Sequence, residues 1–169
     1  MAILPGDIDF YLSGGAANSD VNASLGGAKS SVQVTAATLH NLFDRVTGDE
    51  ADAGDTEYRC VYVQNNHGSL SLVDAVVYIQ TQTPSTNTAA AIALGGEGKN
   101  GTAETVANEN TAPAGESFSA PADKASGLSL GTLAPGEYYP IWIRRVVSAA
   151  ASAYDNDGPL LRVEGDTAA

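Results

Sequence analysis

The chain has 169 residues, a length typical of one domain, and its 20 acidic and 8 basic side chains give a formal net charge of −12 at pH 7. A surface this acidic repels nucleic-acid phosphates and anionic membranes, so we expect neither nucleic acid nor a membrane as a partner. The single cysteine, Cys60, excludes an internal disulfide and any metal site built from several cysteines.

Residues 1–37 are predicted to form an extended N-terminal arm. A short strand pattern at residues 7–12 is followed by a run of Gly, Ala, Ser and Asn that offers almost nothing to bury. Such a segment is expected to be disordered alone or to pack onto a neighbouring subunit. Deletion of residues 2–30 is therefore expected to leave a folded core that no longer binds its partner.

The beginning of the chain does not have the pattern of a signal peptide. It lacks a basic start, and Pro5, Gly6, Asp7 and Asp9 interrupt its apolar residues. No apolar stretch approaches the ~20 residues that span a bilayer. We therefore expect a soluble protein that does not use the general secretory route.

Residues 38–169 are predicted to form a β-sandwich domain. The first strong strand is predicted at residues 56–65, where β-branched and aromatic residues dominate. Its alternation places Tyr58, Cys60 and Tyr62 on one face and Arg59, Val61 and Val63 on the other. Further strands are predicted at residues 74–82, 89–94, 116–120, 137–147 and 159–164.

Three segments have a less regular pattern. Residues 36–46 are interpreted as a strand or a short turn of helix, and residues 47–57 as an acidic loop. Pro140 lies inside the predicted strand 137–147, which favours an edge position or a bulge, since proline cannot donate a ladder hydrogen bond.

Short strands, frequent turn signals and the absence of a long helical pattern predict an all-β protein, an antiparallel β-sandwich of the immunoglobulin-like or jelly-roll type. The Leu133, Pro135 and Gly136 motif predicts a tight turn that lets the next strand cross to the opposite sheet. Each inward apolar side chain is expected to contribute about 1.5–3 kcal/mol. The predicted inward side chains are Tyr62, Val77, Ile79, Ile141, Ile143 and Leu161.

The residues that usually carry catalysis show no recognisable arrangement. Cys60 lies mid-strand among large apolar neighbours, which is typical of an inert thiol, and His40 and His67 fall in different loops. We therefore expect no enzyme, no catalytic residue and no cofactor.

A bound calcium ion is the one alternative with a partial motif. Asp155, Asp157, Gly158 and Glu164 match positions of a calcium loop, but Ala153 stands where the first ligand is needed. An Asp-Asn-Asp-Gly sequence is also typical of a simple turn, so no metal ligand is assigned.

Candidate contact residues come from the arm and from one strong strand. Trp142, Arg144 and Arg145 are consecutive or nearly so, and Trp and Arg contribute strongly to binding where proteins meet. The alternative is an ordinary strand exit with one arginine solvated and the other paired to an acid. The predicted interface residues are Phe10, Tyr11, Leu12, Leu25, Trp142, Arg144 and Arg145.

Three segments, FYLSGGAANSDVNASLGG, GDTEYRCVYVQN and APGEYYPIWIRR followed by LLRVEGDT, resemble a family of tailed-bacteriophage proteins found among virion structural genes. The resemblance implies a virion component assembled in the host cytoplasm. It favours a head decoration (cement) protein that bridges major capsid subunits, and otherwise a tail, collar or neck protein.

The resemblance carries over no functional residue, so partners and assembly follow from the virion role alone. We expect the major capsid protein or other virion proteins as partners, together with self-association as a homo-oligomer, with a trimer as the working model. The alternative from a different class is a carbohydrate- or cell-surface-binding module, a role that immunoglobulin-like sandwiches often have.

Overall fold

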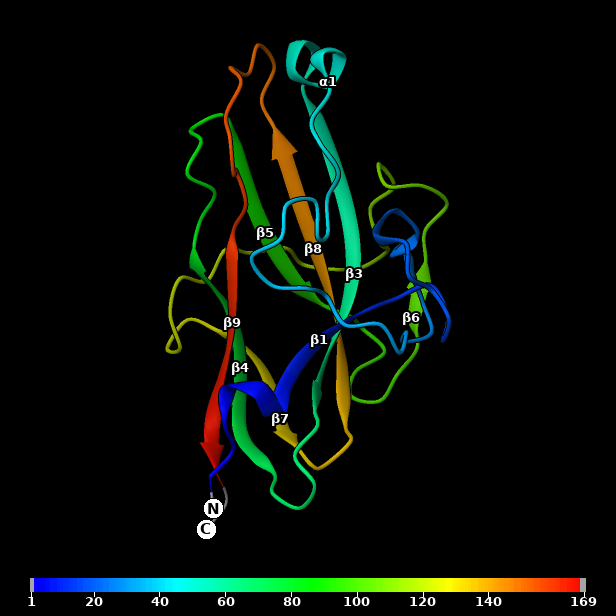
Figure 1. The fold of residues 1–169 in the computed structure, drawn as a ribbon, viewed down its shortest axis with the longest axis vertical. Helices are drawn as coiled ribbons and strands as arrows, with labels where there is room; N and C mark the ends of the chain where they lie inside the picture. Colours follow the sequence, from blue (N-terminus) through cyan, green and yellow to red (C-terminus); the bar gives the residue numbers. More distant parts are fainter. Residues whose placement is uncertain (1, 168–169) are drawn as a thin grey trace.

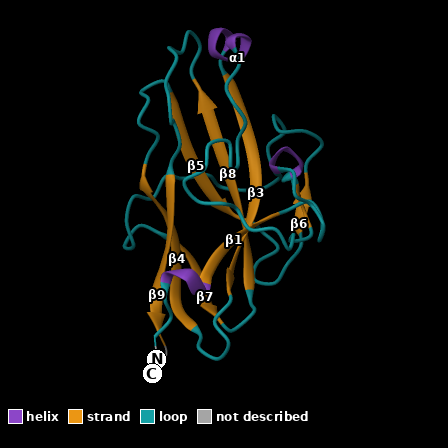
Figure 2. Ribbon diagram, in the orientation of Figure 1, coloured by secondary structure: helices purple, strands orange, loops and turns teal. Residues whose placement is uncertain are grey.

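The computed structural model describes residues 2–167, and antiparallel β-strands account for most of its regular structure (Figures 1 and 2). The strands are β1 (Ile8–Leu12), β2 (Gly26–Gly27), β3 (Asp55–Asn65), β4 (Leu72–Thr81), β5 (Thr88–Leu94), β6 (Ala103–Thr105), β7 (Leu128–Leu133), β8 (Tyr138–Val147) and β9 (Leu160–Thr167). One short helix, α1 (Gly48–Ala53), and 3-10 turns at Pro5–Asp7 and Val21–Ala23 complete the regular elements. The predicted all-β character is confirmed.

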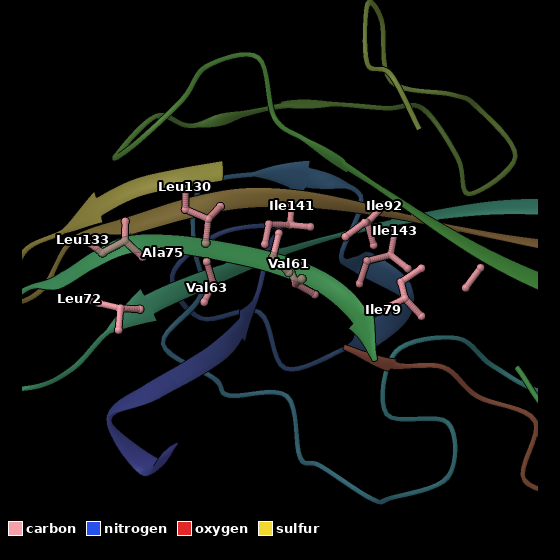
Figure 3. Packing of buried hydrophobic residues seen from close by; sticks show 12 residues of the cluster. Val61, Val63, Leu72, Ala75, Ile79, Ile92, Leu130, Leu133, Ile141 and Ile143 are labelled. Atoms are coloured by element: carbon pink, nitrogen blue, oxygen red, sulfur yellow. The ribbon is translucent and has the colours of Figure 1, made fainter. Parts of the chain in front are cut away.

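Two sheets pack face to face. One has the strand order β1-β3-β8-β5 and the other β7-β4-β9, while β2 and β6 form a small separate pair. Side chains from both sheets fill the space between them (Figure 3). This main core comprises Val61, Val63, Leu72, Ala75, Val77, Ile79, Ala90, Ile92, Leu130, Leu133, Ile141 and Ile143. Burial of large apolar side chains at about 1.5–3 kcal/mol each makes it the principal source of stability.

The four-stranded sheet is buried on both faces. On its other face Tyr58, Cys60, Tyr62 and Trp142 form a second core, which partly buried side chains from the N-terminal segment and from residues 95–120 cover. The predicted alternation of β3 is confirmed, but Tyr62 lies in this second core rather than with Val77 and the other inward residues. Since β3 is covered on both faces, its apolar residues did not indicate which face contacts the main core and which contacts the second core.

The N-terminal segment folds onto its own subunit, so the expectation of an extended arm with nothing to bury is wrong. β1 pairs with β3 from Ile8 opposite Asn65 to Leu12 opposite Val61. The outer edge of β1 is itself covered, because the Leu12 amide donates to the Val32 carbonyl at 3.0 Å and the Val34 amide donates to the Phe10 carbonyl at 2.8 Å. Figure 1 shows this segment lying beside β3 and β6.

Buried serine hydroxyls hold the glycine-rich part of this segment in place. The Ser13 hydroxyl accepts from the Gly26 amide at 3.0 Å, and the Ser30 hydroxyl donates to the Asn18 carbonyl at 2.6 Å. Ser24 accepts from the Ser13 amide at 3.2 Å. Backbone and hydroxyl hydrogen bonds, rather than apolar side chains, thus order a segment whose composition predicted disorder.

The turn before β8 behaves as predicted. The Glu137 amide donates to the Ala134 carbonyl at 3.0 Å, and Gly136 has φ of 81°. A Pro-Gly pair suits such a turn, since proline presets the first central residue and glycine tolerates positive φ at the second. The turn connects β7 in the three-stranded sheet to β8 in the four-stranded sheet, so the predicted crossing is confirmed.

Pro140 does not mark an edge strand or a bulge, because β8 lies between β3 and β5 with Tyr62 opposite Pro140 in regular register. The Pro140 carbonyl accepts from the Gly95 amide at 2.9 Å, and Gly95 directly follows the last residue of β5. A strand residue directs its N–H and C=O to the same side, so the missing N–H faces the end of β5 and the ladder with β3 remains intact.

Three local expectations are also corrected. Residues 36–46 form turns and bends without a helix or strand, and residues 116–120 make a single bridge, Ser119 to Ile92, instead of a strand. The acidic loop contains α1, which Thr47 and Glu50 cap reciprocally, with Thr47 N to Glu50 Oε2 at 2.6 Å and Glu50 N to Thr47 Oγ1 at 3.3 Å. The Thr-x-x-Glu spacing is the sequence signature of this helix start.

Candidate functional site

The structure places most predicted interface residues inside the subunit. Leu12 and Trp142 are 2% and 0% exposed, so their assignment as contact residues is corrected. Phe10 is half-buried against the main core, and Leu25 is half-buried against the second core. Strands covered on both faces turn aromatic residues inward, which explains why aromatic content did not indicate an interface.

Tyr11 and Arg144 make contacts within the chain. The Lys29 ammonium lies 4.0 Å from the centroid of the Tyr11 ring, and the Tyr11 hydroxyl accepts from Asn66 Nδ2 at 3.0 Å. The Arg144 guanidinium lies 5.2 Å from the centroid of the Phe118 ring on the second-core face. Both are cation–π contacts that hold loop segments against the sheet.

Arg145 belongs to a buried charged cluster on the inner face of the four-stranded sheet. It lies opposite Glu57 in the β3–β8 ladder, and its Nε donates to Glu57 Oε2 at 2.5 Å. Both residues are buried, so Arg145 is paired to an acid as the alternative interpretation expects, whereas Arg144 is partly buried instead of solvated. The neighbouring Arg59 donates from Nη2 to Glu109 Oε2 at 2.5 Å.

This cluster fixes the irregular segment 36–46 to the sheet. The Phe43 ring centroid lies 4.8 Å from the Arg145 guanidinium carbon and 5.4 Å from that of Arg59. Arg145 Nη1 also donates to the Asp44 carbonyl at 2.8 Å. Burial raises the pKa of Glu57 to about 7, although Arg145 and Arg59 each lower it.

The same cluster contains the described group of carboxylates closest to a metal-binding arrangement. Oxygen atoms of Asp44, Glu57 and Glu109 lie within 4.8 Å of one another. Arg59 and Arg145 already pair with these carboxylates and supply the balancing positive charge. We therefore describe the cluster as an ion-pair network rather than a cation site.

Two carboxylates of the partial calcium motif make hydrogen bonds and ion pairs in two different parts of the fold. Asp157 accepts from the Ser85 amide at 2.9 Å and from the Thr88 hydroxyl, so it ties the loop before β9 to the β4–β5 connection. Glu164 accepts from the Tyr78 hydroxyl at 2.6 Å and pairs with Arg162 at 2.7 Å within the three-stranded sheet. These carboxylates therefore have structural partners of their own.

Cys60 and the two histidines lie apart from one another. Cys60 is fully buried, and burial raises the pKa of its thiol. His67 Nδ1 accepts from the Ser69 amide at 3.1 Å and from the Leu70 amide at 3.0 Å, so this ring orders the turn before β4. His40 lies in the exposed part of the segment 36–46.

A large groove lies above the ion-pair network. We use the term groove for the cavity of about 1300 Å³ whose walls are residues 34–48 and 150–161. Its floor includes Val61, Ala90 and Ile143 of the four-stranded sheet. Figure 1 shows that this sheet extends past the three-stranded sheet toward α1, and loops border it there.

The rim of the groove carries exposed apolar side chains. Leu39, Tyr154 and Leu160 are 62%, 56% and 53% exposed, and all three line the groove. Sequence reasoning missed this surface because its walls lack helix or strand periodicity. The available signal was the presence of large apolar side chains, Leu39 and Tyr154 among them, in two segments without strand or helix periodicity.

Comparisons with family models, with curated proteins and with solved structures find no match to this chain. Within residues 2–167, no helix combines the length and the apolar character needed to cross a bilayer.

Proposed function

We propose that this chain is a structural protein of a tailed-bacteriophage virion, a capsid decoration (cement) protein that stabilises the head by bridging major capsid subunits. The proposal includes assembly in the host cytoplasm, partnership with the major capsid protein or other virion proteins, and a homo-oligomeric form, with a trimer as the working model. It also includes a β-sandwich of the immunoglobulin-like or jelly-roll type. The resemblance of residues 10–27, 54–65, 134–145 and 160–167 to phage structural proteins supports it.

The observation that carries the proposal is the exposed apolar rim of the groove. Leu39, Tyr154 and Leu160 are three of the four exposed large apolar side chains among the described residues. Apolar side chains gathered on one surface of a soluble protein mark a contact site, since burial against a partner removes them from water. A decoration protein needs such a surface, and here it belongs to the folded body of the subunit.

The packing of the N-terminal segment changes how bridging would work. Because β1 and residues 30–34 are paired within the subunit, this segment is not free to lie along a neighbour. Attachment through the groove uses a surface that is preformed on this chain, which avoids the entropic cost of ordering a flexible arm of its own.

The test compares phage particles produced with and without the gene. We expect mass spectrometry to find the chain in purified particles, and cryo-electron microscopy to show head-surface density that disappears with the gene. Lost density at the tail, collar or neck would instead support the runner-up location. Absence of the chain from purified particles would overturn the virion proposal.

A glycan array separates the carbohydrate- or cell-surface-binding alternative. The structural protein proposed here gives no specific glycan binding. Specific binding to a defined glycan, combined with absence from particles, would replace the proposal.

A further inference from the structure

The edges of the two sheets are protected unequally. Residues 30–34 cover β1, and Ser119 exchanges hydrogen bonds with Ile92 at the outer edge of β5. β7 and β9 are the two edges of the three-stranded sheet, and within residues 2–167 each has β4 as its only strand partner. Of these two edges, only that of β9 contributes residues to the groove. An edge with free backbone donors and acceptors is the usual site for addition of a strand from another chain.

The uncovered edge of β9 begins at the groove. Leu160 and Leu161 form the start of β9 and also line the groove, and the preceding loop with Tyr154 forms its wall. An added strand directs alternate side chains to opposite faces, so a segment that pairs with the start of β9 presents every second side chain of that part to the groove. The cavity volume of about 1300 Å³ exceeds the roughly 300–1,000 Å³ typical of small-molecule sites.

The charge of the groove indicates which kind of segment fits. Asp44, Asp52, Asp155 and Asp157 line it, against Arg45 and Arg145. Asp44 and Arg145 pair with each other, and Asp157 accepts from Ser85 and Thr88. The carboxylates of Asp52 and Asp155 belong to exposed residues. Since the whole chain carries −12, a second copy would bring a similarly acidic surface, whereas a basic segment complements the groove.

We propose that the groove and the edge of β9 together bind an extended segment of a different protein, in which apolar residues alternate with residues of net positive charge. The segment adds a strand to β9, places apolar side chains between Leu39, Tyr154 and Leu160, and directs cationic groups toward Asp52 and Asp155. This inference rests on the groove being the contact surface of the proposed function. It does not depend on the location of the chain in a particle.

The test selects binders to the full chain from a randomised peptide library. The matched variants are the triple change Leu39→Ser, Tyr154→Ser and Leu160→Ser, and the single change Leu4→Ser. Leu4 is 64% exposed and lies outside the groove lining, so it controls for loss of an exposed apolar side chain. Unchanged circular dichroism and melting temperature show that each variant is folded.

We expect enriched peptides to be basic, with alternating apolar residues, and to bind the Leu4→Ser variant as tightly as the unaltered chain. Affinity for the triple variant should fall at least about tenfold, as for truncation of central contact residues. Amide signals of β9 should shift on binding of one synthesised peptide. Replacement of Asp52 and Asp155 by Asn should weaken binding and reduce its dependence on salt.

Three outcomes would overturn the inference. They are the absence of peptides that prefer the unaltered chain over the triple variant, enrichment of acidic peptides, and shifts confined to residues away from β9 and the groove. Sedimentation that shows a dimer broken by the triple variant would assign the groove to a second copy. A chain missing from phage particles that still selects basic peptides would defeat the virion proposal alone.

Discussion

At the scale of single residues, the Arg145–Glu57 pair gives the sharpest stability prediction. Arg145→Ala leaves the buried Glu57 carboxylate without its closest partner, and loss of one member of a buried pair costs about 3–5 kcal/mol. The control is Arg162→Ala, whose pair with Glu164 is half-exposed and should be worth at most about 1 kcal/mol. Urea unfolding measures both, and equal losses would contradict the prediction.

The same carboxyl makes stability depend on pH. Burial raises the pKa of Glu57 to about 7 from its ordinary 4.5, so the folded protein holds a proton there that the unfolded chain releases at lower pH. This stabilising contribution is fully present below pH 4.5 and is lost as pH rises through 7. Glu57→Gln cannot ionise, so this site gives the variant no pH dependence of stability.

Thermal melts between pH 4.5 and pH 7 test whether stability falls with rising pH because of Glu57. The melting temperature of the unaltered chain, minus that of Glu57→Gln, should fall steadily as pH rises across this range. A difference that stays constant or grows with pH would show that the carboxyl is not held in its protonated form by burial.

Substitution of Gly26 tests how closely β2 of the N-terminal segment packs against β6. Its φ is +91°, and an added Cβ would lie 1.7 Å from the Glu104 carbonyl oxygen in β6. Gly15 has φ of +108° and would meet nothing within 4 Å, so Gly15→Ala carries only the cost of left-handed backbone, about 1–2 kcal/mol. Gly26→Ala should lose at least about 2 kcal/mol more. Similar losses in urea would mean that β2 and β6 can separate freely.

At the scale of elements, deletion of residues 2–30 distinguishes a packed segment from a free arm. The deletion removes β1, exposes the edge of β3, and uncovers the second core around Tyr62 and Trp142. We expect an aggregated or non-cooperatively unfolding product, in contrast to the folded core that composition predicts. A soluble truncated chain with a cooperative melt close to that of the full chain would contradict this expectation.

The elements that were predictable from sequence are those whose apolar residues fill the cores. β3, β4, β5, β8 and β9 were found within a few residues of their observed bounds, since each carries β-branched or aromatic residues in strand order. β7 was missed because serine and Gly131, with φ of 67°, dilute its pattern. The order of residues 13–31 was missed because hydrogen bonds of backbone and hydroxyl groups leave no periodic signal.

The candidate site was the least predictable part of the molecule. The aromatic and basic residues that suggested an interface, such as Trp142 and Arg145, instead lie in the second core and in the ion-pair network. The groove arises where two irregular loops border a sheet, and its walls come from segments more than a hundred residues apart. Only the position of these loops in the fold brings Leu39, Tyr154 and Leu160 into one lining.

At the scale of the whole molecule, the acidic charge and the apolar rim of the groove affect association in different ways. The charge of −12 disfavours contact between two acidic surfaces, so attachment is favoured where that charge is locally complemented. If the chain is the virion protein proposed above, a phage carrying Leu39→Ser, Tyr154→Ser and Leu160→Ser in this gene should make a folded chain that is depleted from purified particles. Phage carrying Leu4→Ser should retain it.

Particle stability gives the functional consequence of that depletion. If the chain bridges capsid subunits, many identical contacts act together, and their loss should lower the temperature at which heads release DNA. Particles with the triple variant should release DNA at the temperature of particles that lack the gene, and Leu4→Ser particles at the unaltered temperature. Triple-variant particles that keep both the chain and the unaltered release temperature would show that the groove is not the attachment surface, because three exposed apolar contacts cannot be removed from a working interface without weakening it.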